Sequence, residues 1–185
     1  MPDHAKDRAA AIQWAQQMLE QRCLLLDSET TGLGPDAEIV QLAVVNHQGV
    51  TLFDTLIRPT GLIPPDATAI HGITDEMVED APTFADVYPE LWKVLRDRPL
   101  TIYNANYDTK VIGYVSKSAG LAVPFDWKAV SCCMLKYAAF VGDWNEYRQG
   151  YRWQRLEGGD HSALGDCRAT LKLMREMASA EGENA

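Results

Sequence analysis

The sequence lacks the features of membrane and secreted proteins. No run of 18 apolar residues occurs in its 185 positions, so we expect no membrane-spanning helix. The first residues, MPDHAKDRAA, lack the apolar core of a secretory signal. Cysteine is scarce and never spaced as C-x-x-C, which argues against both a disulfide framework and a zinc site. We therefore expect a cytoplasmic protein with reduced thiols, at Cys23, Cys132, Cys133 and Cys167.

Positive charge is also in short supply. The chain has 17 Lys and Arg residues against 26 Asp and Glu residues, and its formal net charge is −9. A protein that grips duplex nucleic acid through a broad surface usually carries an excess of basic residues. The composition therefore argues against a broad basic face, and bound cations would offset only part of the acidic charge.

Internal repeats, low-complexity tracts and linkers are absent as well. We expect a helical extension over residues 1–22, one domain over 23–180 and a frayed tail over 181–185. Apolar spacing and turn residues predict a mixed α/β fold. Expected strands are 23–29, 39–46 and 50–59, forming an antiparallel meander, then 100–104 and 127–132. Expected helices are 5–22, 83–98, 107–119, a short one ending at 141, and 162–180; residues 61–74 read as a loop with one helical turn.

The stretch CLLLDSETTG, residues 23–32, carries the first chemical signal. An apolar strand runs into Asp27 and Glu29, and residues two apart in a strand point to the same face. Two carboxylates held that close repel each other unless a proton or a cation lies between them. The alternative is a solvated loop that happens to contain two acidic residues.

Three further residues indicate a function only when they are considered together. Asp108 follows the fourth predicted strand in YNANYD, where Asn104 or Asn106 would cap the next helix. His161 lies just before the last predicted helix, and Asp166 lies about one turn inside it. Taken singly, Asp108 would complement a helix dipole, and the other two would be solvent-exposed surface residues.

Together, DSETTGL, AIHGIT, YNANYD and HSALGD resemble, in order and spacing, the motifs of the DEDDh (DnaQ-like) 3′–5′ exonucleases. This family includes the proofreading subunits of bacterial replicative polymerases. The resemblance implies an RNase H-like fold with a five-stranded mixed sheet, three antiparallel strands then two parallel ones, flanked by helices. It implies His161 as the general base and two divalent cations, Mg²⁺ or Mn²⁺, held by four carboxylates: Asp27, Glu29, Asp108 and Asp166.

The resemblance also implies contacts with the substrate. Matched positions that would hold the terminal nucleotide are Thr30, Thr31, Leu33, His71 and Asn104. His71 could instead be a loop histidine bonded to the backbone, and Asn104 either orients Asp108 or touches the substrate. The expected reaction releases nucleoside 5′-monophosphates from the 3′ end of single-stranded DNA. RNA or oligoribonucleotides are the alternative substrate, and a non-catalytic polymerase-associated subunit is the alternative of another class; a polymerase or another replication or repair protein is the expected partner.

The sequence departs from the family pattern in two places. Tyr103 stands where relatives usually carry a histidine. The segment 144–155 interleaves aromatic residues with arginines: Trp144, Tyr147, Tyr151 and Trp153 with Arg148, Arg152 and Arg155. Such a mixture suits stacking on single-stranded bases, and we expect Trp153 or Tyr151, with Arg152, to guide the incoming strand. The alternative is a helix whose aromatic side chains cover the core.

Overall fold

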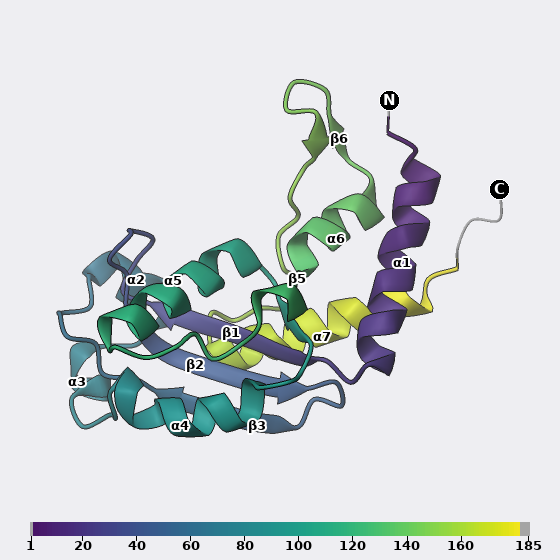
Figure 1. The fold of residues 1–185 in the computed structure, drawn as a ribbon. Coiled ribbons are helices and arrows are strands. Elements are labelled where there is room, and N and C mark those ends of the chain that lie inside the picture. The colour runs from purple at the N-terminus through teal and green to yellow at the C-terminus, as the bar shows by residue number, and fades with distance from the viewer. Residues whose placement is uncertain (1, 182–185) are drawn as a thin grey trace.

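The computed structural model describes residues 2–181, so the predicted frayed tail lies outside the described residues except for Glu181. Figure 1 shows the course of the chain. Its elements, in order, are α1 (His4–Glu20), β1 (Leu24–Thr30), β2 (Ile39–Asn46), β3 (Thr51–Leu56), α2 (Pro65–His71), α3 (Asp75–Val78), α4 (Phe84–Leu95), β4 (Leu100–Ile102), α5 (Ala105–Ser118), a 3₁₀ turn (Trp127–Ala129), β5 (Val130–Cys132), α6 (Cys133–Val141), β6 (Trp144–Asn145), β7 (Gly150–Tyr151) and α7 (Ala163–Ser179).

One five-stranded sheet organises the molecule, in the order β3-β2-β1-β4-β5. β1, β2 and β3 pair antiparallel, and β4 pairs parallel with both β1 and β5. The predicted mixed sheet, with a meander followed by two parallel strands, is confirmed. Because β1 is central and lies between an antiparallel and a parallel neighbour, its carboxyl end is flanked by the start of α5, which follows β4.

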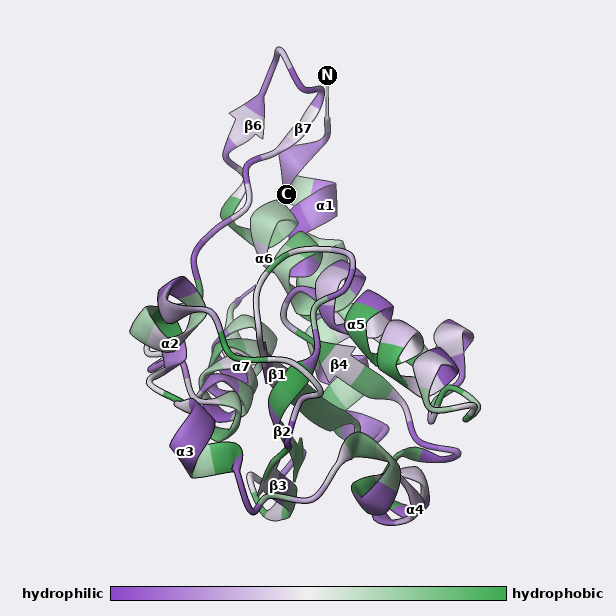
Figure 2. Cartoon of the chain, turned by 90° about the vertical axis from the view of Figure 1, so that its left-hand side faces the viewer, coloured by the Kyte–Doolittle hydropathy of each residue, from purple (hydrophilic) through white to green (hydrophobic). Residues whose placement is uncertain are grey.

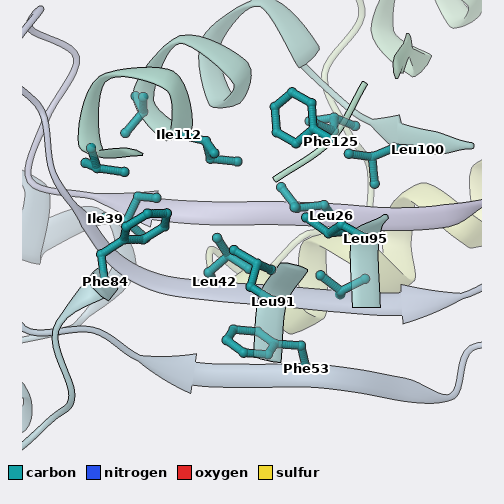
Figure 3. Packing of buried hydrophobic residues seen from close by; sticks show 14 of the residues in the cluster. Leu26, Ile39, Leu42, Phe53, Phe84, Leu91, Leu95, Leu100, Ile112 and Phe125 are labelled. Carbon is teal, nitrogen blue, oxygen red and sulfur yellow. The ribbon is translucent and has the colours of Figure 1, made fainter. Parts of the chain in front are cut away.

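The two faces of the sheet bury different helices. Alternate residues of β1, Leu24 and Leu26, face α4 and α5 in the larger core cluster, with Leu91 and Ile112 from those helices. Figure 3 shows this packing from close by. Residues of the opposite parity, such as Leu25, lie in a second cluster under α7. This alternation is what a strand buried on both faces requires, and it directs neighbouring β1 side chains to different helices.

Helix α1 packs outside α7 at one end of the sheet (Figure 1). Ala11 and Ala15 are buried with Met177 of α7, and the Gln16 side chain donates to the Ala178 carbonyl at 3.0 Å. Small residues at this contact let the two helices approach closely. Among residues 2–181 no helix is both long and apolar enough to cross a bilayer.

Side-chain caps fix the starts of two predicted helices. Thr83 and Asp86 form a reciprocal capping box at the start of α4, and Pro89 lies within the helix without ending it. Ser162 accepts the N–H of Gly165 at 3.1 Å and so caps α7. Asn104, one of the two predicted cap residues, occupies the cap position of α5, although its side chain makes no capping bond.

Two loop predictions need correction. Residues 61–74 contain the seven-residue helix α2 rather than a single turn, and α3 follows directly. Pro65 suits the first turn of α2, and Gly72, with φ of 75°, ends it in the left-handed region. The fifth strand is shorter than predicted because the Asp126 side chain accepts the Lys128 N–H at 2.9 Å and closes a 3₁₀ turn.

Residues 144–151 form a β-hairpin, so the helix that we gave as the alternative for this segment is wrong. Trp144 pairs directly with Tyr151, and Asn145 pairs with Gly150. The Asn145 side chain accepts the Arg148 N–H at 3.0 Å and tightens the turn. The hairpin projects from the body beyond α6 (Figure 2). It follows that this segment does not cover the core of the sheet.

Candidate active site

An acidic group lies at the carboxyl half of β1. Asp27 and Glu29 leave the strand on the face that also holds Leu25 and is covered by α7. Asp166 of α7 completes the group, since one carboxylate oxygen from each of these three residues lies within 4.8 Å of the others. The structure thus brings together three of the four acidic residues that the sequence singles out.

The loop immediately before α7 packs tightly against the Asp166 carboxylate. Its Oδ1 accepts the N–H of Asp160 at 3.1 Å, and a Cβ at Gly159 would lie only 2.6 Å from the same oxygen. A Cβ at Gly165 would in turn overlap the carboxylate of Asp160. Glycine at these two positions therefore lets the loop close onto the start of α7.

Asp108 approaches from the other side of the sheet. It lies in the first turn of α5, is only 3% exposed, and accepts a hydrogen bond from Ser28 Oγ at 2.7 Å. Ser28 stands between Asp27 and Glu29 and so points to the opposite face of β1. Asp108 is not part of the group of three. It is nevertheless close enough to raise the pKa of the two β1 carboxyls, Asp27 and Glu29. Sequence reasoning missed Ser28, whose only signal was its alternating position.

His161 is exposed and stands in the loop before α7, outside the acidic group. Its φ of 59° lies in the left-handed region, which is uncommon for residues other than glycine, and it turns the chain just before the Ser162 cap. The backbone of His161, with the N–H of Asp160, contacts the Asp166 carboxylate and opposes the rise that burial causes in the pKa of that group. The role of its imidazole as general base stays a prediction.

Burial and mutual repulsion disfavour ionisation of the acidic residues. Burial, with help from the neighbouring carboxylates, holds the pKa of Asp27 well above its usual range. The same two causes raise the pKa of Glu29 to about 8. Burial raises the pKa of Asp108 to about 6, although the bond from Ser28 opposes the shift. Burial also raises the pKa of Asp166.

The donor set suits a hard divalent cation. Within residues 2–181 none of the ion pairs involves these carboxylates, so no Lys or Arg balances them. Two charges about 5 Å apart repel by roughly 3 kcal/mol at an effective dielectric constant of about 20. A cation among carboxylate oxygens removes that repulsion, and Mg²⁺ or Mn²⁺ takes such ligands. The group could therefore bind metal.

The residues predicted to bind the terminal nucleotide divide into two kinds. Thr30, Thr31 and His71 are engaged within the protein: Thr30 Oγ1 bonds the Gly32 carbonyl and Thr31 Oγ1 accepts the Glu38 N–H. His71 accepts the N–H of Ile73 on Nδ1 at 3.0 Å, which leaves Nε2–H to donate to the Thr30 carbonyl at 3.2 Å. The backbone-bonding alternative for His71 thus describes its contacts.

Leu33 and Asn104 instead line a pocket of about 840 Å³. Leu33 is 88% exposed, a high value for an apolar side chain. The pocket is completed by α5, the start of α6 and the segment after the hairpin, through Tyr107, Lys110, Leu135 and Trp153 among others. Asn104 does not hydrogen-bond Asp108, whose partner is Ser28, so of its two predicted roles the pocket position fits contact with a ligand.

Comparison with known proteins points to one family. The RNase_T family, described as exonuclease, matches residues 24–174. The exonuclease CP81 of Escherichia phage 186, itself called uncharacterized, is 39% identical over 92% of this chain and 95% of its own length. The DNA polymerase III epsilon subunit of Treponema pallidum is 30% identical over 82% of this chain and 74% of its own length. The DNA polymerase III epsilon subunit of Buchnera aphidicola is 35% identical to this chain, and the match spans only 45% of the length of that subunit.

Solved structures agree in fold. Exonuclease X in complex with 5′ overhanging duplex DNA superposes with a TM-score of 0.56 at 27% identity, covering 87% of this chain and 95% of that one. Apo exonuclease I gives a TM-score of 0.67 at 21% identity, covering 83% and 41% of the respective chains. The second likeness concerns the fold of the shared region alone.

The raised pKa values predict how stability depends on pH without metal. Between the unfolded pKa of about 4 and the folded pKa of Glu29 of about 8, the folded state binds more protons than the unfolded state. The free energy of unfolding in chelator should therefore fall as pH rises through this window. Glu29→Gln should flatten part of the fall and raise the melting temperature at pH 8, whereas Glu90→Gln, on the exposed side of α4, should change neither. Thermal melts from pH 5 to 9 measure this, and parallel curves for wild type and Glu29→Gln would contradict it.

Proposed function

Since the chain belongs to the exonuclease family and is a DnaQ-like 3′–5′ exonuclease, we propose that its substrate is single-stranded DNA. The reaction hydrolyses the terminal phosphodiester bond at the 3′ end and releases a nucleoside 5′-monophosphate. One observation carries this proposal: the half-buried carboxylates at the end of β1 form no ion pair with Lys or Arg among the described residues, and the same chain forms a pocket against α5. Free thiols throughout the described chain suit a reducing compartment, and we propose the cytoplasm.

The acidic residues form the catalytic centre in this proposal. We assign two divalent cations, Mg²⁺ or Mn²⁺, to four carboxylates: Asp27, Glu29, Asp108 and Asp166. When bound, such ions activate a water and neutralise the charge that develops on the leaving oxygen. Ser28 fixes one Asp108 oxygen through its hydrogen bond at 2.7 Å, and the loop N–H of Asp160 fixes one Asp166 oxygen. These two bonds orient the carboxylates before a substrate arrives.

His161 acts as the general base that takes the proton of the attacking water. Its place in a loop, outside α7, allows the imidazole to approach the acidic group when substrate is present. The loop is nevertheless tied at Asp166 through its backbone. The backbone of the short loop that carries His161 is therefore held by the Asp166 carboxylate.

The terminal nucleotide occupies the pocket beside Leu33 and Asn104. Leu33, largely exposed, packs on the base, and Asn104 offers a polar contact. The hydrogen bonds of Thr30, Thr31 and His71 described above hold the backbone next to Leu33 in place. The relatives named exonuclease X and exonuclease I are described in complexes with DNA, which favours DNA over RNA. Relatives that are polymerase III subunits make a polymerase the proposed protein partner.

Metal dependence tests the catalytic centre. Mg²⁺ or Mn²⁺ should support activity, and Ca²⁺ should support little, because it prefers more ligands at longer distances. Asp27→Ala should lower kcat by orders of magnitude without unfolding the protein, while Asp80→Ala, an exposed acid outside the site, should leave kcat unchanged. Full activity in EDTA, or in the Asp27 variant, would refute the metal-dependent mechanism.

A degradation panel tests the substrate. Labelled single-stranded DNA should be degraded faster than blunt duplex DNA and RNA, and a 3′ overhang on a duplex should be removed down to the junction. A 3′-phosphate should slow the reaction sharply, since it replaces the free hydroxyl end, whereas a 5′ block should not. Faster degradation of RNA would transfer the proposal to the ribonuclease alternative, and no degradation of any strand would favour a non-catalytic subunit.

His161→Ala tests the base. Loss of a general base usually costs about 10²–10⁴-fold in kcat, and metal affinity should change little because His161 lies outside the acidic group. The matched control is His47→Ala, in the turn between β2 and β3. Single-turnover rates and calorimetric metal titration would be measured for both variants. A kcat close to wild type would show that another group takes the proton.

A further inference from the structure

The β6–β7 hairpin separates its aromatic residues into two kinds. Trp144 and Tyr151 face each other with ring centroids 5.2 Å apart, and both contact the His4 ring of α1. The Tyr151 hydroxyl donates to the Asp7 carboxylate at 2.7 Å. These contacts hold the hairpin against α1, so Tyr151 has a structural role, and its part in guiding the strand stays a prediction.

The other aromatic side chains face solvent. Tyr147 at the turn is 96% exposed, and Trp153, just after β7, is 68% exposed. Arg148, Arg152 and Arg155 are exposed beside them. Exposed aromatic rings among arginines have the composition of surfaces that stack single-stranded bases and contact phosphates. In a chain of net charge −9, residues 144–155 hold three arginines against one acid, Glu146, and Asp143 just before them pairs with Arg152.

Trp153 joins two hollows. It lines the pocket that contains Leu33 and Asn104, and it also lines a hollow of about 550 Å³ on the hairpin with Arg148 and Arg152. Trp153 is therefore shared by the pocket assigned to the terminal nucleotide and the hollow beside the arginines of the hairpin. Figure 2 shows the hairpin standing clear of the body, beyond α6.

Trp153 is held in place by its neighbours in the chain. The hydroxyl of Tyr103 donates to the carbonyl of Gln154 at 2.7 Å. The backbone N–H of Arg152 donates to the Asp143 carbonyl at 2.8 Å, and the Arg152 guanidinium pairs with the Asp143 carboxylate at 3.3 Å. Tyr103 immediately precedes Asn104 of the pocket. Tyr103 thus ties the segment after the hairpin to the end of β4.

We propose that this hairpin surface binds the single-stranded DNA immediately upstream of the terminal nucleotide, an inference that rests on the proposed function. Trp153 stacks on a base as the strand leaves the pocket. Arg148 and Arg152 contact the phosphates that follow, and Tyr103 is the positioning residue that holds the Trp153 segment. Charge complementarity and continuity with the pocket select a nucleic acid strand over an apolar partner.

Length dependence of KM tests the proposal. KM would be measured for single-stranded DNA of 2, 4, 8 and 16 nucleotides, and wild type should show a lower KM for the longer strands. Trp153→Ala should raise KM for the 16-mer about 5- to 160-fold, the range of one lost stacking contact, and so remove much of the length advantage. Trp153→Phe, which keeps a ring, should restore most of it. Trp127→Ala, a control at a tryptophan that is 53% exposed elsewhere on the surface, should behave as wild type.

Salt dependence tests the arginines separately. The slope of log KM for the 16-mer against log salt concentration should fall by about 0.7 in Arg148→Ala, the change expected for one lost phosphate contact on a single strand. Tyr103→Phe should raise KM for the 16-mer less than Trp153→Ala does. Thermal melts would verify that each variant is folded.

The outcomes separate the two proposals. A wild-type enzyme that degrades no single-stranded DNA refutes the proposed function. If wild type degrades it without any length advantage, or if Trp153→Ala and Arg148→Ala keep the wild-type KM and salt slope, the function stands and the hairpin surface is refuted.

Discussion

Repulsion among closely spaced, partly buried carboxylates is the constraint on which the site depends. Asp27 is surrounded by the carboxylates of Glu29, Asp108 and Asp166, and no Lys or Arg of the described chain forms an ion pair with any of them. Each close pair costs roughly 3 kcal/mol if both groups are charged. The surrounding structure has to supply that energy or remove the charge. Well-packed layers on both faces of the sheet make this possible, because they hold β1, α5 and α7 rigidly against one another.

The site is assembled from both faces of one strand. Asp27 and Glu29 meet α7, whereas Ser28, between them, meets Asp108 of α5. Alternate residues of β1 face different helical layers. A one-residue shift in strand register would therefore turn Asp27 and Glu29 away from α7 and Ser28 away from Asp108 at the same time. The hydrogen bond from Ser28 gives Asp108 a partner, which is consistent with a smaller rise in its pKa than in the pKa values of Asp27 and Glu29.

Much of this fold could be predicted from the sequence because its signals are local. Alternation in β1 put Asp27 and Glu29 on one face, and Ser162 marked the start of α7. What failed depends on contacts between distant segments. The hairpin at 144–151 is stabilised by α1, almost the whole chain away, and no local pattern distinguishes it from a short helix. The Ser28–Asp108 bond spans 80 positions and was invisible for the same reason.

The position of α1 has a consequence for the order in which the chain is made. Its buried face, including Ala11 and Ala15, is covered by α6, α7 and, through Asp7, the hairpin. All of these come from the last third of the sequence. Proteins are synthesised from the N-terminus at about 5–20 residues per second, so α1 leaves the ribosome seconds before its partners exist. The segment translated first is therefore among the last to be enclosed, and the nascent chain carries an uncovered apolar stripe until α7 emerges.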